Sequence, residues 1–318
     1  MKGMTPRNDK EREFMKTFDD LCYSRTRWQV WDDFVHMAAL SIVNAVDKKH
    51  FDAREERFMR IRKPYKEKEF NGFAHLFSIT ALALEENPWQ DFLGELYMRC
   101  DLGNNDSGQF FTPYHICEMM AKIILAGEDG AKTKAEIEGK GYVSVCDPCI
   151  GGGAMLIGAA QALHEMGINY QQECVFVGQD VDSTVAMMAY IQLSLLGCPG
   201  YIKIGDSLRY PMTGNVLFGD DEGHTYYTPM FLTEKFEFLR RAEILKQLFY
   251  SVGTAEKPQT DANNHQPKAA MQQLEPVVQQ PEPVVRQLKA PDDGPQFIEI
   301  SKKKGKAMAG QIMFDLGI

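Results

Sequence analysis

Three aspartates in the middle of the sequence could bind a polar ligand. Asp147 ends the run "YVSVCD", Asp180 ends "CVFVGQD", and Asp206 ends "YIKIGD". A carboxylate accepts hydrogen bonds from hydroxyl and amino groups and attracts positive charge, but it repels phosphate. The three side chains therefore suit a cationic or hydrogen-donating ligand.

A glycine-rich turn follows the first of these aspartates. Asp147 and Pro148 precede Gly151 and Gly153. Glycine permits a sharp strand-to-helix turn and lets a ligand approach the backbone closely, although tight packing between the strand and the helix is an alternative role. A dinucleotide pyrophosphate would favour a third glycine where Leu156 stands, and no acid in the turn, which disfavours a nicotinamide dehydrogenase.

Together these features predict an adenosyl cofactor without phosphate, S-adenosylmethionine (SAM). Asp147 would face its sulfonium and amino groups, and Asp180 would accept both ribose hydroxyls. Asp206 would reach the adenine amino group.

The elements that position these aspartates alternate along the chain. The apolar runs that end on acids are separated by helix-like segments, "AMLIGAAQALHEMG" and "TVAMMAYIQLSLLG". Alternating strands and helices are typical of an α/β fold with a doubly wound parallel sheet, in which ligands bind at the carboxyl ends of the strands. The fold class predicted is therefore α/β with a parallel sheet that brings the three acids to one edge.

The composition and periodicity of the sequence change at three places. Residues 1–105 carry helical periodicity and predict a helical N-terminal domain, and 106–252 form the predicted cofactor-binding domain. Residues 253–296 are rich in Pro and Gln and nearly free of aromatic residues, which predicts a disordered linker. Residues 297–318 are expected to be a C-terminal interaction peptide.

Four motifs in order resemble a known family, the modification subunits of type I restriction-modification systems, which are adenine-N6 DNA methyltransferases. They are "GQFFTP" at 108–113, "DPCIGGGAML" at 147–156, "GQDVD" at 178–182 and "GDSL" at 205–208, preceded by the similar segment "DFLGELYM" at 91–98. The resemblance covers roughly residues 88–210. It implies a Rossmann-like, SAM-dependent methyltransferase fold, DNA as substrate, and a partner subunit that supplies DNA specificity.

The resemblance also implies that the 108–113 loop packs over the methionine end of the cofactor. Phe110, Thr112 and Pro113 would be the contacts. The same residues are equally consistent with an ordinary helix start, with Thr112 as N-cap and Pro113 in the first turn.

The sequence departs from the family at the catalytic motif, which is Asn or Asp followed by Pro-Pro and an aromatic residue. No Pro-Pro occurs in the chain. The segment "NVLFGDD" is expected to be a fourth strand, with Asp220 as a substitute acceptor for the adenine amine and Tyr227 stacking on a flipped base. An exposed turn is the alternative for Asp220 and its acidic neighbours.

The sheet is also short. Either it is truncated, leaving an edge that a partner chain covers, or a hairpin around Gly219 to Gly223 closes it. Two function hypotheses follow: an active adenine-N6 DNA methyltransferase, and a catalytically degenerate SAM-binding accessory protein tethered to DNA or to a sliding clamp.

The C-terminus predicts a separate contact. Gln311 to Leu316 resembles a degenerate sliding-clamp-binding peptide on a tether. The alternatives are a frayed tail and a tail that docks on its own domain.

Composition limits the remaining function classes. A net charge of −9 argues against gripping nucleic acid with the whole surface, so DNA contact must be local or assisted. The seven cysteines are scattered, which predicts reduced thiols and no metal site. No long apolar stretch or signal sequence is visible, so a cytoplasmic protein without membrane contact is expected.

Overall fold

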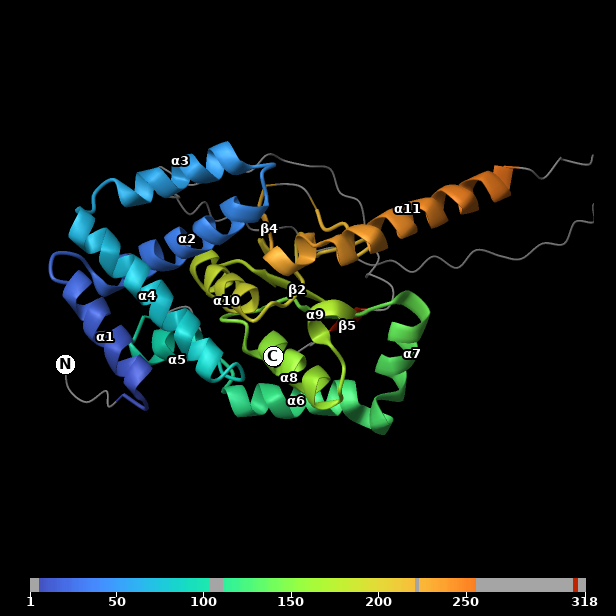
Figure 1. The fold of residues 1–318 in the computed structure, drawn as a ribbon, viewed down its shortest axis with the longest axis horizontal. Helices are drawn as coiled ribbons and strands as arrows, with labels where there is room; N and C mark the ends of the chain where they lie inside the picture. Colours follow the sequence, from blue (N-terminus) through green and yellow to red (C-terminus); the bar gives the residue numbers. More distant parts are fainter. Residues whose placement is uncertain (1–5, 103–110, 221–222, 256–310, 314–318) are drawn as a thin grey trace, which may run out of the picture. The chain divides into compact units, whose positions relative to one another are not determined.

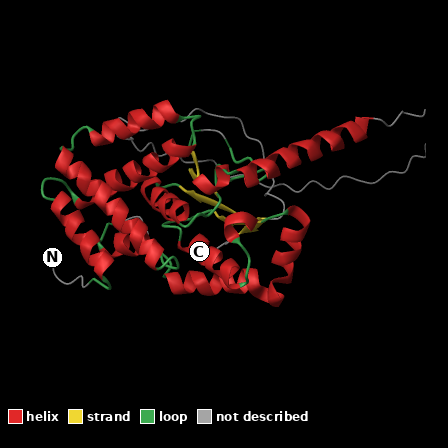
Figure 2. Cartoon of the chain, in the orientation of Figure 1, coloured by secondary structure: helices red, strands yellow, loops and turns green. Residues whose placement is uncertain are grey.

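The structure is a computed structural model that describes residues 6–102, 111–220, 223–255 and 311–313 (Figure 1). The described residues form mainly helices around a small sheet (Figure 2). Residues 1–245 together with the C-terminal strand belong to one compact unit, and 246–304 form a second. The site lies in the first unit.

The N-terminal region is helical, as expected from its periodicity. Its helices are α1 (Asp9–Leu21), α2 (Arg27–Val46), α3 (Phe51–Arg62), α4 (Glu67–Glu86) and α5 (Phe92–Arg99). Side chains cap three of them at the N-terminus: Asn8 accepts from the Glu11 amide, Thr26 from that of Gln29, and Asp91 from that of Gly94. Each cap satisfies a backbone donor that has no partner within the helix.

A five-stranded sheet follows. Its strands are β1 (Val143–Asp147), β2 (Cys174–Asp180), β3 (Gly200–Ile204), β4 (Thr225–Tyr227) and β5 (Gln311–Met313), in the order β4-β3-β2-β1-β5. Strands β1, β2, β3 and β5 run parallel, and β4 pairs antiparallel with β3. The predicted α/β fold with a parallel sheet is confirmed.

Further helices precede, connect and follow the strands of the sheet. They are α6 (Tyr114–Ala126), α7 (Ala131–Lys140), α8 (Ala154–Glu165), α9 (Tyr170–Glu173), α10 (Ser183–Leu195) and α11 (Glu234–Ala255), with short 3-10 helices at Gly127–Gly130 and Pro229–Leu232. Strand β2 shows why the segments that form the parallel strands are almost wholly apolar. Phe176 packs into the core shared with α8, α10 and the N-terminal helices, whereas Val175 and Val177 pack with Phe231 and Phe236 in a second cluster. A strand buried on both faces needs apolar residues at successive positions.

The predicted fourth strand over "NVLFGDD" is wrong. Residues 215–218 form a turn in which the Asn215 side chain accepts a hydrogen bond from the Leu217 amide. The strand comes later, at β4, because Thr225 to Tyr227 can pair with β3 as a hairpin. That hairpin covers the β3 edge, in agreement with the hairpin alternative, and β5 covers the β1 edge.

Several predictions fall largely outside the described residues. The predicted linker at 253–296 is described only through Ala255, where α11 ends, and the C-terminal peptide only at 311–313. Within the described residues, no helix is both long and apolar enough to cross a membrane. All seven cysteines are free thiols, and Cys149 is the exposed one.

Candidate functional site

The glycine turn joins the carboxyl end of β1 to α8. Asp147 is 4% exposed, and its Oδ1 accepts a hydrogen bond from the Cys149 amide at 3.0 Å. Gly151 and Gly153 have φ of 52° and 99°, in the left-handed region that disfavours other residues. Gly153 is the N-cap of α8. The backbone conformation of the turn is therefore by itself sufficient reason for glycine at these two positions.

Close packing explains part of the glycine pattern as well. A Cβ atom on Gly153 would lie 3.2 Å from the Ala189 Cβ in α10, and one on Gly152 would lie 3.1 Å from the Asp91 carboxylate. A Cβ on Gly151 would instead meet the Phe111 ring at 3.4 Å. The packing alternative thus accounts for two of the glycines, and Gly151 is the one beneath an aromatic side chain.

Asp180 connects the ends of the three parallel strands. Its Oδ2 accepts a hydrogen bond from the Gly151 amide at 2.9 Å, and its Oδ1 accepts one from the Asp182 amide at 3.0 Å. Its backbone carbonyl accepts from the Gly205 amide at 2.8 Å. The structure therefore brings the turn after β1, the end of β2 and the end of β3 together, as the parallel sheet predicts.

Asp206 shapes the turn after β3. Its Oδ1 accepts from the amides of Leu208 and Arg209 at 2.9 and 3.1 Å, and the Arg209 Nε lies 3.5 Å from its Oδ2. Val181, directly after Asp180, is 73% exposed beside this edge.

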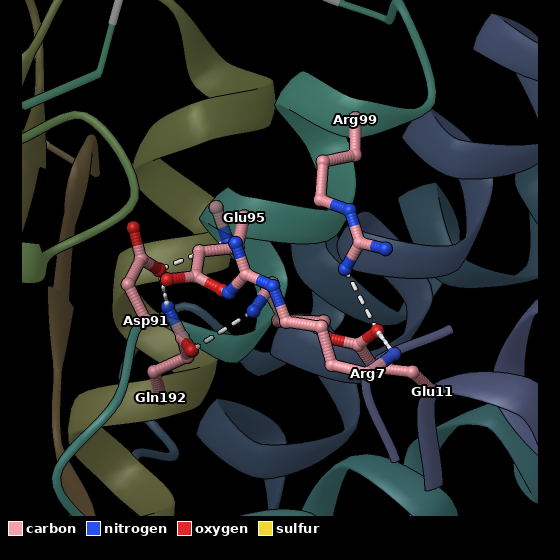
Figure 3. Close-up of polar contacts among 8 residues, drawn as sticks. Arg7, Glu11, Asp91, Glu95, Arg99 and Gln192 are labelled. Carbon is pink, nitrogen blue, oxygen red and sulfur yellow. Dashed lines mark hydrogen bonds and ion pairs between the residues drawn. The ribbon is translucent and has the colours of Figure 1, made fainter. Parts of the chain in front are cut away.

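A buried polar network ties the turn to the N-terminal helices (Figure 3). The Gln192 side chain, 0% exposed in α10, donates from Nε2 to Asp91 Oδ1 at 2.7 Å and to the Gly152 carbonyl at 2.8 Å. Its Oε1 accepts from the Leu93 amide at 3.1 Å, and Asp91 Oδ1 also accepts from the Gly94 amide at 2.9 Å. One glutamine thus holds α5 against the middle of the turn.

Ion pairs next to this network join α5 to the N-terminal region around α1. Arg99 on α5 contacts Glu11 at 2.7 Å, and Arg7 pairs with Glu95 (Figure 3). These pairs join the two helices beside the site, although partly exposed ion pairs each contribute little to stability.

The carboxyl groups around the turn are electrostatically uncompensated. Burial raises the pKa of Asp147 to about 7 and that of Asp91 to about 6, and it also raises the pKa of Asp180. Within the described ranges, none of the three forms an ion pair with Lys, Arg or His. Buried carboxylates are normally paired, so an uncompensated set favours a ligand that brings positive charge.

Phe111, a neighbour of the predicted contacts in the 108–113 motif, lies over this turn. Phe110 lies outside the described residues. Phe111 stacks on Tyr97 with ring centroids 5.7 Å apart and covers Gly151. Pro113, rather than the predicted Thr112, is the N-cap of α6, because the helix begins at Tyr114. Phe111 was missed although it belongs to the same motif.

The predicted catalytic pair occupies the β3–β4 hairpin. The Asp220 carboxylate pairs with the Lys203 ammonium and accepts from the Thr225 hydroxyl. The Tyr227 hydroxyl donates to the Asp220 carbonyl at 2.9 Å, while its ring stacks on Phe231 with centroids 5.9 Å apart. These contacts occupy the groups that catalysis would use. Both catalytic roles therefore stay predictions.

Among the described residues, no group of three or more His, Cys, Asp or Glu side chains could hold a metal ion.

Known proteins resemble this chain over the same region. Residues 91–229 match the family model described as N-6 DNA Methylase. The predicted family resemblance is confirmed. The matched region contains the glycine turn, the three acids and Gln192, and it begins at Asp91, the buried carboxyl that Gln192 contacts.

One match to this chain comes from the solved structures. The crystal structure of the type I restriction-modification system methyltransferase subunit from Streptococcus thermophilus is 16% identical, with a TM-score of 0.33. The match covers 64% of this chain and 45% of that one, so the chain corresponds to less than half of that subunit. No curated protein matches the sequence.

Proposed function

We propose that the chain binds SAM at the carboxyl edge of its sheet and acts in the methylation of adenine N6 in DNA. The observation that carries the proposal is the hydrogen bond from the Gly151 amide to the Asp180 carboxylate, beside the buried Asp147, which forms no ion pair with a described residue. The match of residues 91–229 to N-6 DNA methylases supports the same class.

The residues at this edge fit the chemical groups of SAM. Each Asp180 oxygen accepts one backbone hydrogen bond, and a carboxylate has about four acceptor positions, so it can still accept ribose hydroxyls. Asp147 would balance the positive charge, and Asp206 would accept from the adenine amine. Phe111 would cover the turn. The other proposed contacts are Pro148, Gly153, Thr112, Pro113 and, outside the described residues, Phe110.

Bound SAM would supply a methyl group on a positively charged sulfur. The adenine amine is a weak nucleophile because its lone pair is delocalised into the ring, so a polar group must accept its hydrogens during attack. Asp220 is the candidate acceptor on this chain. It can serve only if its carboxylate leaves Lys203 and Thr225 or uses its remaining lone pairs.

The occupied Asp220 carboxylate favours a second candidate function, a SAM-binding accessory protein without transfer activity. In either case we propose DNA as the partner macromolecule and a separate subunit as the source of DNA specificity. Sliding-clamp binding lacks support, because Gln311–Met313 of the predicted clamp peptide pairs with β1.

Calorimetric titration with SAM tests the proposal. The purified chain should bind SAM saturably, and Asp180→Asn should weaken binding by about tenfold or more, since it removes a charge and an acceptor next to the ligand. Asp9→Asn is the matched control because the Asp9 carboxylate is 91% exposed on α1. Thermal unfolding of each variant separates lost binding from lost folding.

Three results bear on the two functions. Absence of SAM binding by the folded wild-type chain would refute both candidates. Where SAM binds, transfer of labelled methyl groups from SAM to DNA supports the methyltransferase, and binding without transfer, with DNA and candidate partner subunits present, supports the accessory protein.

A further inference from the structure

The strand at the end of the chain closes the sheet next to the proposed cofactor turn. Strand β5 pairs parallel with β1, with Ser144 opposite Gln311, Val145 opposite Ile312 and Cys146 opposite Met313 (Figure 1). On its other side β1 pairs with β2 along its whole length. Among the described residues, β5 is the strand that makes β1 an interior strand.

Strand β1 has the composition of an interior strand. Each residue from Val143 to Asp147 is buried, including the polar Ser144. An uncovered edge would expose a row of backbone donors and acceptors beside apolar side chains, a template for non-specific pairing. Strand β1 therefore needs a neighbouring strand on this side, and in the structure β5 of the same chain supplies it.

We propose that Gln311–Met313 is a working part of the SAM site, because it holds β1 and therefore places Asp147. This inference rests on the proposed function. Asp147 is the last residue of β1, and its carboxyl group accepts a hydrogen bond from the turn that Asp180 also holds. When β5 leaves, β1 keeps one neighbour instead of two, and the turn loses the rigid strand from which it starts.

The occupant is the chain's own segment. Residues 256–310 connect α11 to β5. At up to roughly 3.3 Å per residue, a connection of this length does not restrict which edge is reached. A segment on the same chain also competes at a millimolar effective concentration, well above that of a second copy in a micromolar solution.

Two C-terminal truncations of the chain test the proposal. One variant ends after Gly310 and lacks β5, and its matched control ends after Met313 and keeps β5. Amide hydrogen exchange across 143–147 reads the strand directly, and calorimetry reads SAM affinity. The shorter variant should lose protection at β1 and bind SAM roughly 10- to 100-fold more weakly. The control should match the full chain in both.

A substitution pair repeats the test without shortening the chain. Ile312→Pro removes a backbone donor and cannot continue a ladder, whereas Ile312→Val keeps the donor and the strand preference. The proline variant should behave like the shorter truncation and the valine variant like the wild type. A synthetic peptide of residues 305–318 should restore β1 protection to the truncated chain.

Several outcomes would overturn the proposal. Unchanged protection at β1 without β5 would show that the strand is not held there. Lost protection with unchanged SAM affinity would show that β5 stabilises the sheet without serving the site. Protection that rises with protein concentration would assign the strand to a second copy. If the full chain binds no SAM, the proposed function fails, and the exchange data still decide whether β5 covers β1.

Discussion

Replacing Asp91 by Asn is expected to stabilise the protein near neutral pH. Burial raises the pKa of Asp91 from 3.8 to about 6, outweighing the hydrogen bonds from Gln192 and Gly94 that favour its charged form. The folded state therefore disfavours the carboxylate. A difference of about two pH units in pKa corresponds to ~3 kcal/mol, an upper value for the cost of ionised Asp91 in the fold.

The direction of the pH effect follows from the raised pKa. Below pH 4 the group is protonated in both states and the cost is absent. Between pH 4 and 6 the unfolded chain loses its proton first, so the wild-type free energy of unfolding falls as pH rises. Above pH 6 the full cost is present. Asp147, with a pKa of about 7, contributes in the same direction up to pH 7.

Asp91→Asn preserves the contacts while removing the charge. Its side-chain oxygen can still accept from Gly94 and Gln192, and Asn is as good an N-cap as Asp. Urea unfolding should show the variant more stable than the wild type by up to ~3 kcal/mol at pH 7, and equal to it near pH 4. Asp91→Ala, which leaves both donors unpaired, should lose about 1–3 kcal/mol near pH 4 and less at pH 7, where removing the charge offsets the loss.

The same variant separates stability from binding. If the charge near Gly152 helps to attract a cation, Asp91→Asn should unfold at higher urea concentration and yet bind SAM more weakly. A variant that is less stable than the wild type at pH 7, with an unchanged pH dependence, would refute the reasoning, because it would mean that the carboxylate is favoured in the folded state.

Two further substitutions test the turn and the hairpin. Gly153→Ala should cost about 1–3 kcal/mol in thermal unfolding, because φ is 99° and the new methyl group would crowd Ala189, whereas Gly139→Ala, in open space within α7, should be neutral or stabilising. A destabilising Gly139→Ala of equal size would contradict this. Asp220→Asn should lose about 1–3 kcal/mol in urea unfolding, because the Lys203 side chain is 9% exposed and loses its carboxylate partner. If Asp220 also accepts the adenine amine, methyl transfer should fall far more than SAM affinity, and an equal fall in both would argue against that role.

The meeting of the acidic strand ends at one edge of the sheet was predictable because its signals are local. Asp147, Gly151 and Asp180 each lie within a few residues of a strand end, and parallel strands place those ends together whatever the rest of the chain does. The predicted fourth strand was wrong because two local signals compete there. "NVLFGDD" is apolar enough for a strand, but the Asn215 side chain accepts a hydrogen bond from the Leu217 amide, and that local turn prevails.

For Gln192, the sequence indicates the need for hydrogen-bond partners but does not identify those partners. A glutamine inside the apolar helix "TVAMMAYIQLSLLG" must find hydrogen-bond partners when buried. Those partners, Asp91 and Gly152, are distant in sequence. Only packing of α5 against α10 brings them together, so no periodicity or motif could have named them.

The sequence by itself determined the α/β alternation, the acidic strand ends, the glycine turn and the family resemblance, since each depends on neighbouring residues and repeated spacing. The tertiary structure decided which helix packs on the turn, that Lys203 pairs with Asp220, and that Gln311–Met313 completes the sheet beside β1. These contacts join segments far apart in the chain. Their formation depends on the burial and hydrogen bonding of the whole fold, which no local pattern records.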